Sequence, residues 1–200
     1  PCWAVKALAV DEKKGRVKGK VLSRGKGVRG VIVSDGYSVT STDAKGRYEI
    51  DPNPAPAAVF ISVPSGFQFI HENGIARHYR MIDNITNGTR VDFELEPLPG
   101  DDTKHRFFIW ADPQVKNSQD VHKLMTESVP DMQRHIAQSG NSLMHGITVG
   151  DITWDNHDLF KDYTGAIGKM NIPFFQVLGN HDMDYKGSHD SVSDVTFKSH

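Results

Sequence analysis

Three apolar runs in the second half of the chain each end abruptly at polar residues. They span residues 106–111, 143–149 and 174–178. Continuous apolar runs of this length predict strands of a parallel sheet that is covered on both faces. The residues that follow them, among them Asp112, Asp151 and Asn180, are expected to project from the carboxyl ends of the strands. Ligands of open α/β sheets bind at that edge.

The segments between these runs are long enough for helical crossovers. Asp112 and Asp151 are 39 residues apart, and Asp151 and Asn180 are 29 apart, which suits parallel neighbours joined through helices. The expected helices are one capped by Ser118 and Asp120 that Pro130 interrupts, one capped by Ser128, and one over residues 157–170. The resulting β-α-β-α-β order predicts a three-layer α/β start over residues 104–200.

From residue 15 to about residue 97 the pattern changes to short runs separated by turn residues. The runs lie at 17–21, 31–34, 37–42, 47–50, 58–63 and 91–95. Residues 43–46 form a hairpin turn that ends on Gly46. Strands at this pitch predict a small antiparallel β-sandwich. The proline-rich and charged stretch at 97–104 marks a boundary, so the expected fold is mixed, with domains at 15–97 and 104–200.

Composition adds few constraints. The net charge of -2 and the isoelectric point near 6.6 show no basic bias, so nucleic-acid binding is not expected. Cys2 is the only cysteine, which excludes an internal disulfide, and it is either inert or a lipid-attachment site of an exported precursor. Residues 1–10 are too short to span a membrane. We expect an exported protein, periplasmic or at the cell surface, although a cytoplasmic location and any oligomeric state stay open.

The polar residues at the three strand ends form an ordered set of motifs. They are D-x-Q at residues 112–114, G-D-x-x-x-D at 150–155 and G-N-H-D at 179–182. This set resembles the metal-binding signature of the calcineurin-like metallophosphoesterases over roughly residues 104–200. The pattern around residues 19–21, 27–36 and 42–48 is similar to the transthyretin-like or carboxypeptidase-regulatory-like module that precedes the catalytic domain in one branch of that family.

The motifs supply oxygen ligands suited to a two-metal centre. Two divalent ions about 3.5 to 4 Å apart neutralise charge on a phosphoryl group and activate water. Asp151 is the natural bridge because a carboxylate offers two oxygens, whereas the amides of Gln114 and Asn180 offer one each. The resemblance implies Asp112, Gln114 and Asp151 on one ion, with Asp151 and Asn180 on the other.

The resemblance also implies roles for the residues beside the ligands. His181 would contact the phosphoryl group or act as the acid for the leaving oxygen, and Asp182 would orient its imidazole. Asp155 would orient ligands or the loop rather than bind metal. Trp154, which follows the middle strand beside Asp155, is a candidate for the wall of the substrate cleft, whereas Trp110 is expected to pack in the sheet.

Two departures from the family pattern change the expectations. Gln114 stands where a histidine is usual, although some branches carry D-x-Q. Its hard amide oxygen favours manganese, magnesium or iron over zinc. No G-H-x-H motif, which completes the second metal site in the family, occurs in these residues. We therefore expect the 200 residues to be the N-terminal part of a longer protein.

The sequence leaves two functional classes. One is a metal-dependent phosphoester hydrolase that acts on a monoester, diester or pyrophosphate of a phosphorylated small molecule or a lipid- or nucleotide-type substrate. The alternative is a surface binding module with a catalytically degenerate phosphoesterase domain. Ligands at all three strand ends favour the hydrolase.

Overall fold

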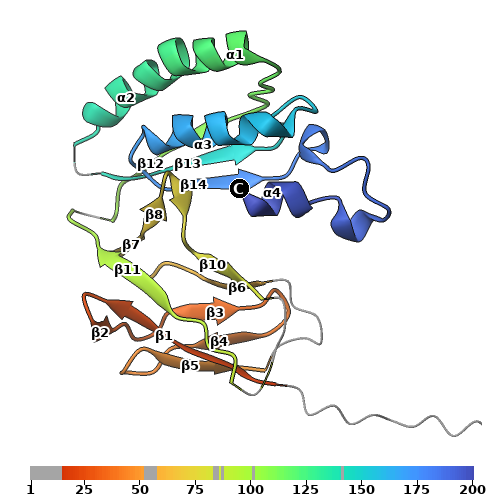
Figure 1. Ribbon diagram of the computed structural model, residues 1–200. Coiled ribbons are helices and arrows are strands. Elements are labelled where there is room, and N and C mark those ends of the chain that lie inside the picture. Colours follow the sequence, from red (N-terminus) through yellow and green to blue (C-terminus); the bar gives the residue numbers. More distant parts are fainter. Residues whose placement is uncertain (1–14, 52–57, 83–85, 87, 101, 141) are drawn as a thin grey trace, which may run out of the picture. The chain divides into compact units, whose positions relative to one another are not determined.

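The computed structural model describes residues 15–51, 58–82, 86, 88–100, 102–140 and 142–200 (Figure 1). Its contacts divide the chain into two compact units: the first holds Pro1–Ser62 and Tyr79–Phe93, and the second holds Val63–His78 and Glu94–His200. Cys2, the candidate lipid-attachment site, lies outside the described residues. Across the described residues, no helix combines the length and apolar character that a membrane span requires.

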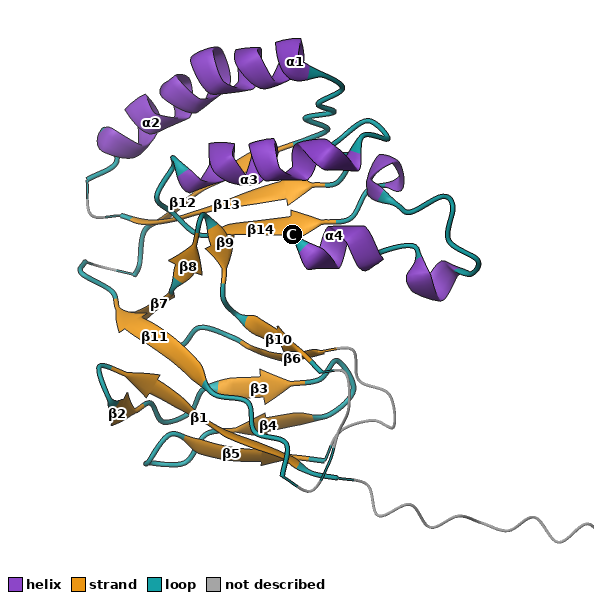
Figure 2. Ribbon diagram, viewed as in Figure 1, coloured by secondary structure: helices purple, strands orange, loops and turns teal. Residues whose placement is uncertain are grey.

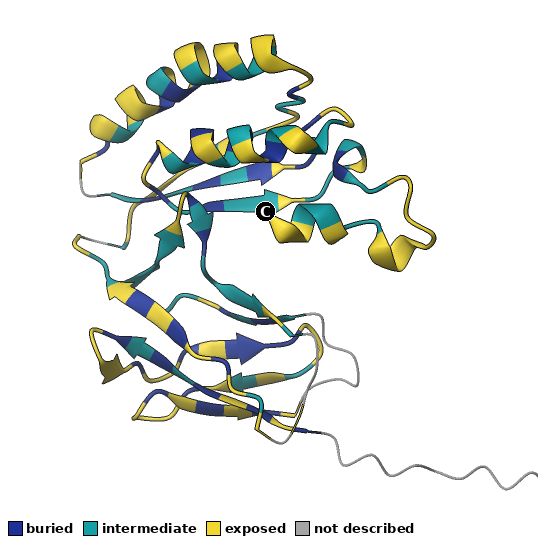
Figure 3. Ribbon diagram, in the orientation of Figure 1, coloured by how far each residue is buried: buried dark blue, intermediate teal, exposed yellow. Residues whose placement is uncertain are grey.

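The first unit consists of short antiparallel strands. They are β1 (Val17–Ser23), β2 (Lys26–Gly27), β3 (Ile32–Ser34), β4 (Val39–Ser41), β5 (Arg47–Ile50), β6 (Ala58–Ile61) and β10 (Tyr79–Met81). β1 pairs with β2 and β5, and β3 pairs with β4 and β6. Alternate residues of β1 and β5 are buried (Figure 3), as expected of strands with one face on a core. The predicted β-rich N-terminal region is confirmed.

The segment from residue 63 to residue 78 packs with the second unit. It holds β7 (Phe67–Phe69), β8 (His71–Glu72) and β9 (Ile75–Ala76), and β7 pairs with β11 (Phe93–Pro97). β9 extends the parallel sheet because Ile75 pairs with Phe174. β7, β8 and β9 have two or three residues each and are too short to show the alternation that indicates a strand. The division into domains 15–97 and 104–200 stays a prediction.

A parallel sheet forms the centre of the second unit. Its main strands are β12 (His105–Trp110), β13 (Leu143–Val149) and β14 (Phe174–Val177), in the order β12-β13-β14-β9-β8. The first three are parallel, and helices connect each to the next (Figure 2). The fold is therefore mixed, as predicted, with a β-rich region followed by strands that alternate with helices. Its assignment to the first half of a three-layer metallophosphoesterase domain stays a prediction.

The helical segment after β12 differs from the expectation of two separately capped helices. α1 (Ser118–Lys123) continues through a π-helical turn (Leu124–Ser128) into α2 (Val129–Ala137). The N-cap is Asn117, whose side chain accepts hydrogen bonds from two backbone N–H groups, rather than Ser118 or Asp120. Ser128 has helical torsion angles and makes no capping bond. Pro130 does not end the helix because it follows the wider π turn and lies in the first turn of α2, where its missing N–H is tolerated.

The core of the second unit lies between these helices, α3 (Phe160–Gly168) and one face of the sheet (Figure 2). The predicted third helix is present as a 3₁₀ turn (His157–Leu159) followed by α3. Between β13 and α3, the hydroxyl groups of Thr148 and Tyr163 are hydrogen-bonded to each other. Burial raises the pKa of Tyr163 to about 12. The opposite face, which the sequence predicted to be covered, is covered only in part by the described residues: Phe69 and His78 pack against Phe175. The large apolar side chains that stay exposed on it are Phe107, Ile109, Val149 and Val177.

Candidate functional site

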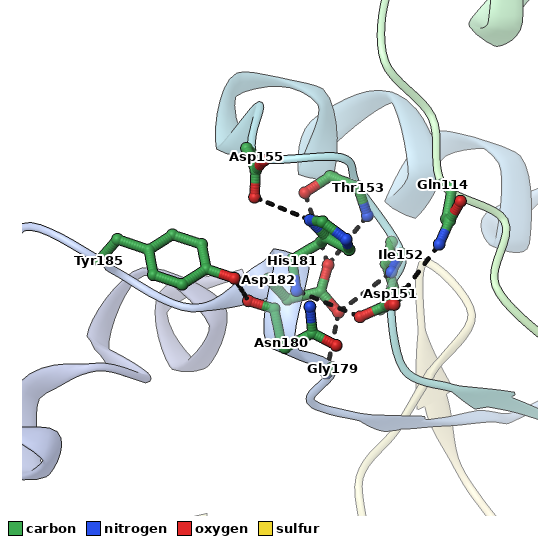
Figure 4. Close-up of polar contacts among 10 residues, drawn as sticks. All are labelled: Gln114, Asp151, Ile152, Thr153, Asp155, Gly179, Asn180, His181, Asp182 and Tyr185. Atoms are coloured by element: carbon green, nitrogen blue, oxygen red, sulfur yellow. Dashed lines mark hydrogen bonds and ion pairs between the residues drawn. The ribbon is translucent and has the colours of Figure 1, made fainter.

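The carboxyl ends of the three parallel strands are level with one another. Trp110 pairs with Thr148, and Thr148 pairs with Gln176, so each chain leaves the sheet at nearly the same height. The loops that follow carry the residues predicted as ligands. Figure 4 shows Gln114, Asp151, Asn180 and His181 gathered from these three loops.

Asp151 is the central residue of this group. Its carboxylate accepts a hydrogen bond from the Gln114 amide at 3.4 Å and another from the backbone N–H of His181 at 3.1 Å. Its backbone carbonyl accepts from the backbone N–H of Gln114 at 2.9 Å. Asp151 therefore contacts both neighbouring loops. Asp112 lies two residues before Gln114, and it makes no hydrogen bond or ion pair within the described part of the chain.

Backbone hydrogen bonds hold the first two loops together beyond the ends of their strands. Val115 donates to the carbonyl of Ile152 at 3.1 Å, and Trp154 donates to the carbonyl of Val115 at 3.1 Å. Val115 and Thr153 form an isolated parallel bridge. The sheet thus continues briefly into the site, which fixes the spacing of residues 114 and 151.

Gly179 brings the third loop against Asp151. A Cβ atom at this position would lie 2.0 Å from the backbone nitrogen of Asp151 and 2.2 Å from its Oδ1. The φ angle of Gly179 is -102°, which lies outside the left-handed region. Glycine is needed at this position for close approach to the carboxylate.

Four non-glycine residues of the site have a left-handed backbone. The φ angles are +47° at Asp112, +44° at Gln114, +49° at Asp151 and +55° at Asp155. Aspartate tolerates this region better than most residues, but each such position costs free energy that surrounding contacts must offset. Strain of this kind concentrates where a side chain is kept for its chemistry.

Asp182 lies beneath the site and is fully buried. Its carboxylate accepts hydrogen bonds from the backbone N–H groups of Ile152, Thr153 and Gly179 at 2.9 to 3.0 Å. These bonds join the second and third loops. The role expected of Asp182, orienting the imidazole of His181, is therefore corrected, because the carboxylate oxygens are directed at backbone N–H groups.

Asp155 holds the imidazole of His181 instead. The Nδ1 atom of His181 lies 2.9 Å from Oδ1 of Asp155, and the backbone N–H of Asp155 donates to the carbonyl of His181 at 3.2 Å. Asp155 and His181 are thus joined by two hydrogen bonds, one between their side chains and one between their backbones. The sequence signal for this pair was the second aspartate of the G-D-x-x-x-D motif, which was expected to orient ligands or the loop.

Trp154 completes the surroundings of His181. Its ring stacks on the imidazole with centroids 3.9 Å apart and planes 19° apart. The Nζ atom of Lys116 lies 4.0 Å from the centroid of the same indole. No spacing in the sequence pointed to this stack. Trp110, by contrast, packs on Tyr163 and Phe174 in the core.

A cavity of about 650 Å³ opens beside Asp112 and Gln114. Its wall includes apolar residues and two lysines, namely Ile109, Trp110, Pro113, Leu124, Lys116 and Lys123. Trp154 is not part of this wall. The cavity is large enough for a small organic molecule next to the predicted ligands.

The donors at the strand ends are oxygens from two carboxylates and two amides. In the described residues, no three histidine, cysteine, aspartate or glutamate side chains gather closely enough to hold a metal ion. Gln114 and Asn180 fall outside those residue types, and hard oxygen donors of this kind suit magnesium or manganese. The ligand and catalytic roles of these residues stay predictions.

Comparison with known proteins identifies the first part of the chain. Residues 15–98 match the family MetallophosN, described as the N terminal of calcineurin-like phosphoesterase. No curated protein matches the chain significantly. The matched region ends before the strand-end motifs, so the chemistry of the site is argued from its own residues.

Proposed function

We propose that this chain belongs to a metal-dependent phosphoester hydrolase, because residues 15–98 match the N-terminal domain of calcineurin-like phosphoesterases. The observation that supports the proposal most is the contact of Asp151 with the loops of both neighbouring strands. A carboxylate between two sets of oxygen donors is the arrangement that a pair of divalent ions requires.

The proposed metal ligands are the four oxygen-bearing residues at the strand ends. Asp112, Gln114 and Asp151 would hold one ion, and Asp151 and Asn180 the other. Bound divalent ions would neutralise the phosphoryl group and supply an activated water. The hard oxygen donors favour manganese, magnesium or iron over zinc.

His181 is the proposed acid for the leaving oxygen. Its Nδ1 atom is bonded to the carboxylate of Asp155, which fixes the tautomer and leaves Nε2 to face a substrate. Asp182 acts indirectly, since it holds the backbone of the loops that carry Asp151 and His181. The substrate is a phosphorylated small molecule or a lipid- or nucleotide-type ester.

The proposal is tested with the complete protein on a generic phosphomonoester and phosphodiester. We expect hydrolysis with manganese that chelator abolishes, with zinc supporting a lower rate. Asp151→Asn should lower kcat/KM by about a hundredfold or more, because the bridging charge is lost. The matched control is Asp158→Asn, an exposed aspartate in the 3₁₀ turn that follows this loop, and it should retain activity. Equal rates with and without chelator would contradict the metal mechanism, and no hydrolysis of either ester would favour a degenerate binding module.

A further inference from the structure

The imidazole of His181 is restrained by more than its hydrogen bond to Asp155. That bond fixes one atom, Nδ1, at 2.9 Å from a carboxylate that is itself 48% exposed. The imidazole can still turn about the Cα–Cβ and Cβ–Cγ bonds, because an exposed carboxylate can move with it while the hydrogen bond is kept. The plane of the imidazole, and with it the direction of Nε2, therefore depends on a second contact.

Trp154 makes that second contact. A separation of 3.9 Å between centroids and an angle of 19° between planes describe a stacked pair in van der Waals contact. Tilting the imidazole would break this stack. The indole is 38% exposed although it is one of the largest side chains, so burial alone does not explain its position beside the site.

The indole is itself held by Lys116. The ammonium group lies 4.0 Å from the ring centroid, well within the range of a cation–π interaction. The backbone supports the pair, because Trp154 donates to the carbonyl of Val115, the residue next to Lys116. Lys116 also lines the cavity beside Asp112. A continuous set of contacts thus runs from the cavity wall through the indole to the imidazole.

We propose that Trp154 is a positioning residue that fixes the ring plane of His181, with Lys116 holding the indole in place. The inference rests on the proposed function, in which Nε2 of His181 delivers a proton to the leaving oxygen. Proton transfer requires a donor aligned with its acceptor, so a tilted imidazole should lower kcat more than it raises KM.

The test compares Trp154→Phe with Trp154→Leu in the complete manganese-loaded protein. Leucine cannot stack, so we expect kcat to fall about tenfold to a hundredfold with little change in KM. Phenylalanine keeps an aromatic face and should retain most of kcat. Lys116→Met should lower kcat about two- to fivefold, in line with the strength of an exposed cation–π contact. The matched control is Phe107→Leu, which removes an aromatic ring stacked on His145 away from the site and should leave kcat unchanged.

A second measurement uses the metal-free protein and does not depend on activity. The ring current of the indole should shift the imidazole C–H proton resonances of His181 upfield, and His181→Gln identifies these resonances by their loss. We expect the shift to disappear in Trp154→Leu, to persist in part in Trp154→Phe, and to be unchanged in Lys123→Met, which alters the other lysine of the cavity wall.

The two measurements separate failure of the inference from failure of the proposed function. Wild-type kcat and an unchanged His181 resonance in Trp154→Leu would overturn the inference, as would equal losses of kcat in the phenylalanine and leucine variants. If the complete protein hydrolyses no phosphoester, the proposed function fails, and the resonance alone decides whether the indole fixes the imidazole. If Trp154→Leu does not fold, Lys116→Met carries the test, and wild-type kcat with an unchanged His181 resonance in that variant would overturn the inference.

Discussion

Both units of the chain contain left-handed backbone positions, but they fill them with different residues. In the first unit these positions are turns, and among the described residues they are Arg24, Gly25, Gly30, Gly36 and Gly46. Among the described residues at the edge of the parallel sheet, one is Gly150 and the other four bear side chains, namely Asp112, Gln114, Asp151 and Asp155. Glycine adopts this conformation without a Cβ penalty, whereas other residues adopt it at a cost. Glycine thus predominates in the turns, where the backbone conformation is what matters. Residues with polar side chains predominate at the sheet edge, where the side chains are what matters.

The polar side chains of the two regions differ in the same way. In the first unit, the buried hydroxyl of Thr42 donates to the carbonyl of Val28 and accepts from the N–H of Val31. That polar group is satisfied within the fold. At the sheet edge, Asp112 forms no hydrogen bond or ion pair with any described residue. Oxygens left open at a strained position are what a ligand site requires, and a purely structural role would not need them.

Asp182 is an exception among the residues at the sheet edge, because its carboxylate has hydrogen-bond partners within the fold. We expect Asp182→Ala to lower the free energy of unfolding by about 3 kcal/mol or more, since two buried backbone N–H groups and a third that is partly buried would lose their acceptor. This is the largest effect expected of the substitutions considered. Urea denaturation of the metal-free protein measures it.

The control for this prediction is Asp155→Ala. Asp155 is exposed and bonds the imidazole, so its loss should change stability little while lowering kcat. If Asp182→Ala folded with wild-type stability but lost activity, the interpretation of Asp182 as a structural residue would be wrong.

The sequence predicted where the site lies better than how its residues contact one another. The three apolar runs, the glycines and the oxygen ligands placed the candidate residues at the carboxyl ends of the strands. The sequence could not show whether Asp155 or Asp182 is hydrogen-bonded to the imidazole of His181, because that choice depends on the geometry of the loops. The stack of Trp154 on His181 has no periodic signal and required coordinates.

The sequence also predicted the long strands better than the short ones. Strands of four or more residues follow alternation or apolar runs, so β1, β5 and β13 were predicted. The association of residues 63–78 with the second unit depends on long-range contacts, among them the pairings of Ile75 with Phe174 and of Phe69 with Leu95, which no local pattern could indicate. The uninterrupted helix through Pro130 also depended on a local detail, the π turn before it.

In each unit, one glycine lies so close to neighbouring backbone atoms that a side chain would overlap with them. In Gly19→Ala the new Cβ would lie 1.7 Å from the carbonyl oxygen of Val91, and in Gly179→Ala it would lie 2.0 Å from the backbone nitrogen of Asp151. Each substitution should lower the free energy of unfolding by about 2 to 3 kcal/mol through overpacking. Only Gly179→Ala should also lose stabilisation by manganese, because it displaces the bridging carboxylate. Thermal unfolding with and without manganese measures both effects.

The manganese-dependent rise in Tm distinguishes the two glycine variants, because a ligand that binds the native state stabilises it by mass action. An equal rise in both variants would show that the approach of Gly179 to Asp151 does not shape a metal site. No rise in the wild-type protein would instead contradict the proposed metal centre.

The smallest effect concerns the strain at Gln114. Gln114→Gly removes a side chain from a backbone with φ of +44°, and Arg24→Gly does the same at φ of +49° in a turn of the first unit. Each should raise the free energy of unfolding of the metal-free protein by about 1 kcal/mol, the cost of a left-handed residue that bears a Cβ. Arg24→Gly should keep the manganese-dependent rise in Tm, and Gln114→Gly should reduce it, since a ligand oxygen is lost. If Gln114→Gly were less stable than wild type while Arg24→Gly were more stable, the contact of the amide with Asp151 would outweigh the strain. Gln114 would then contribute to stability as well as to the site.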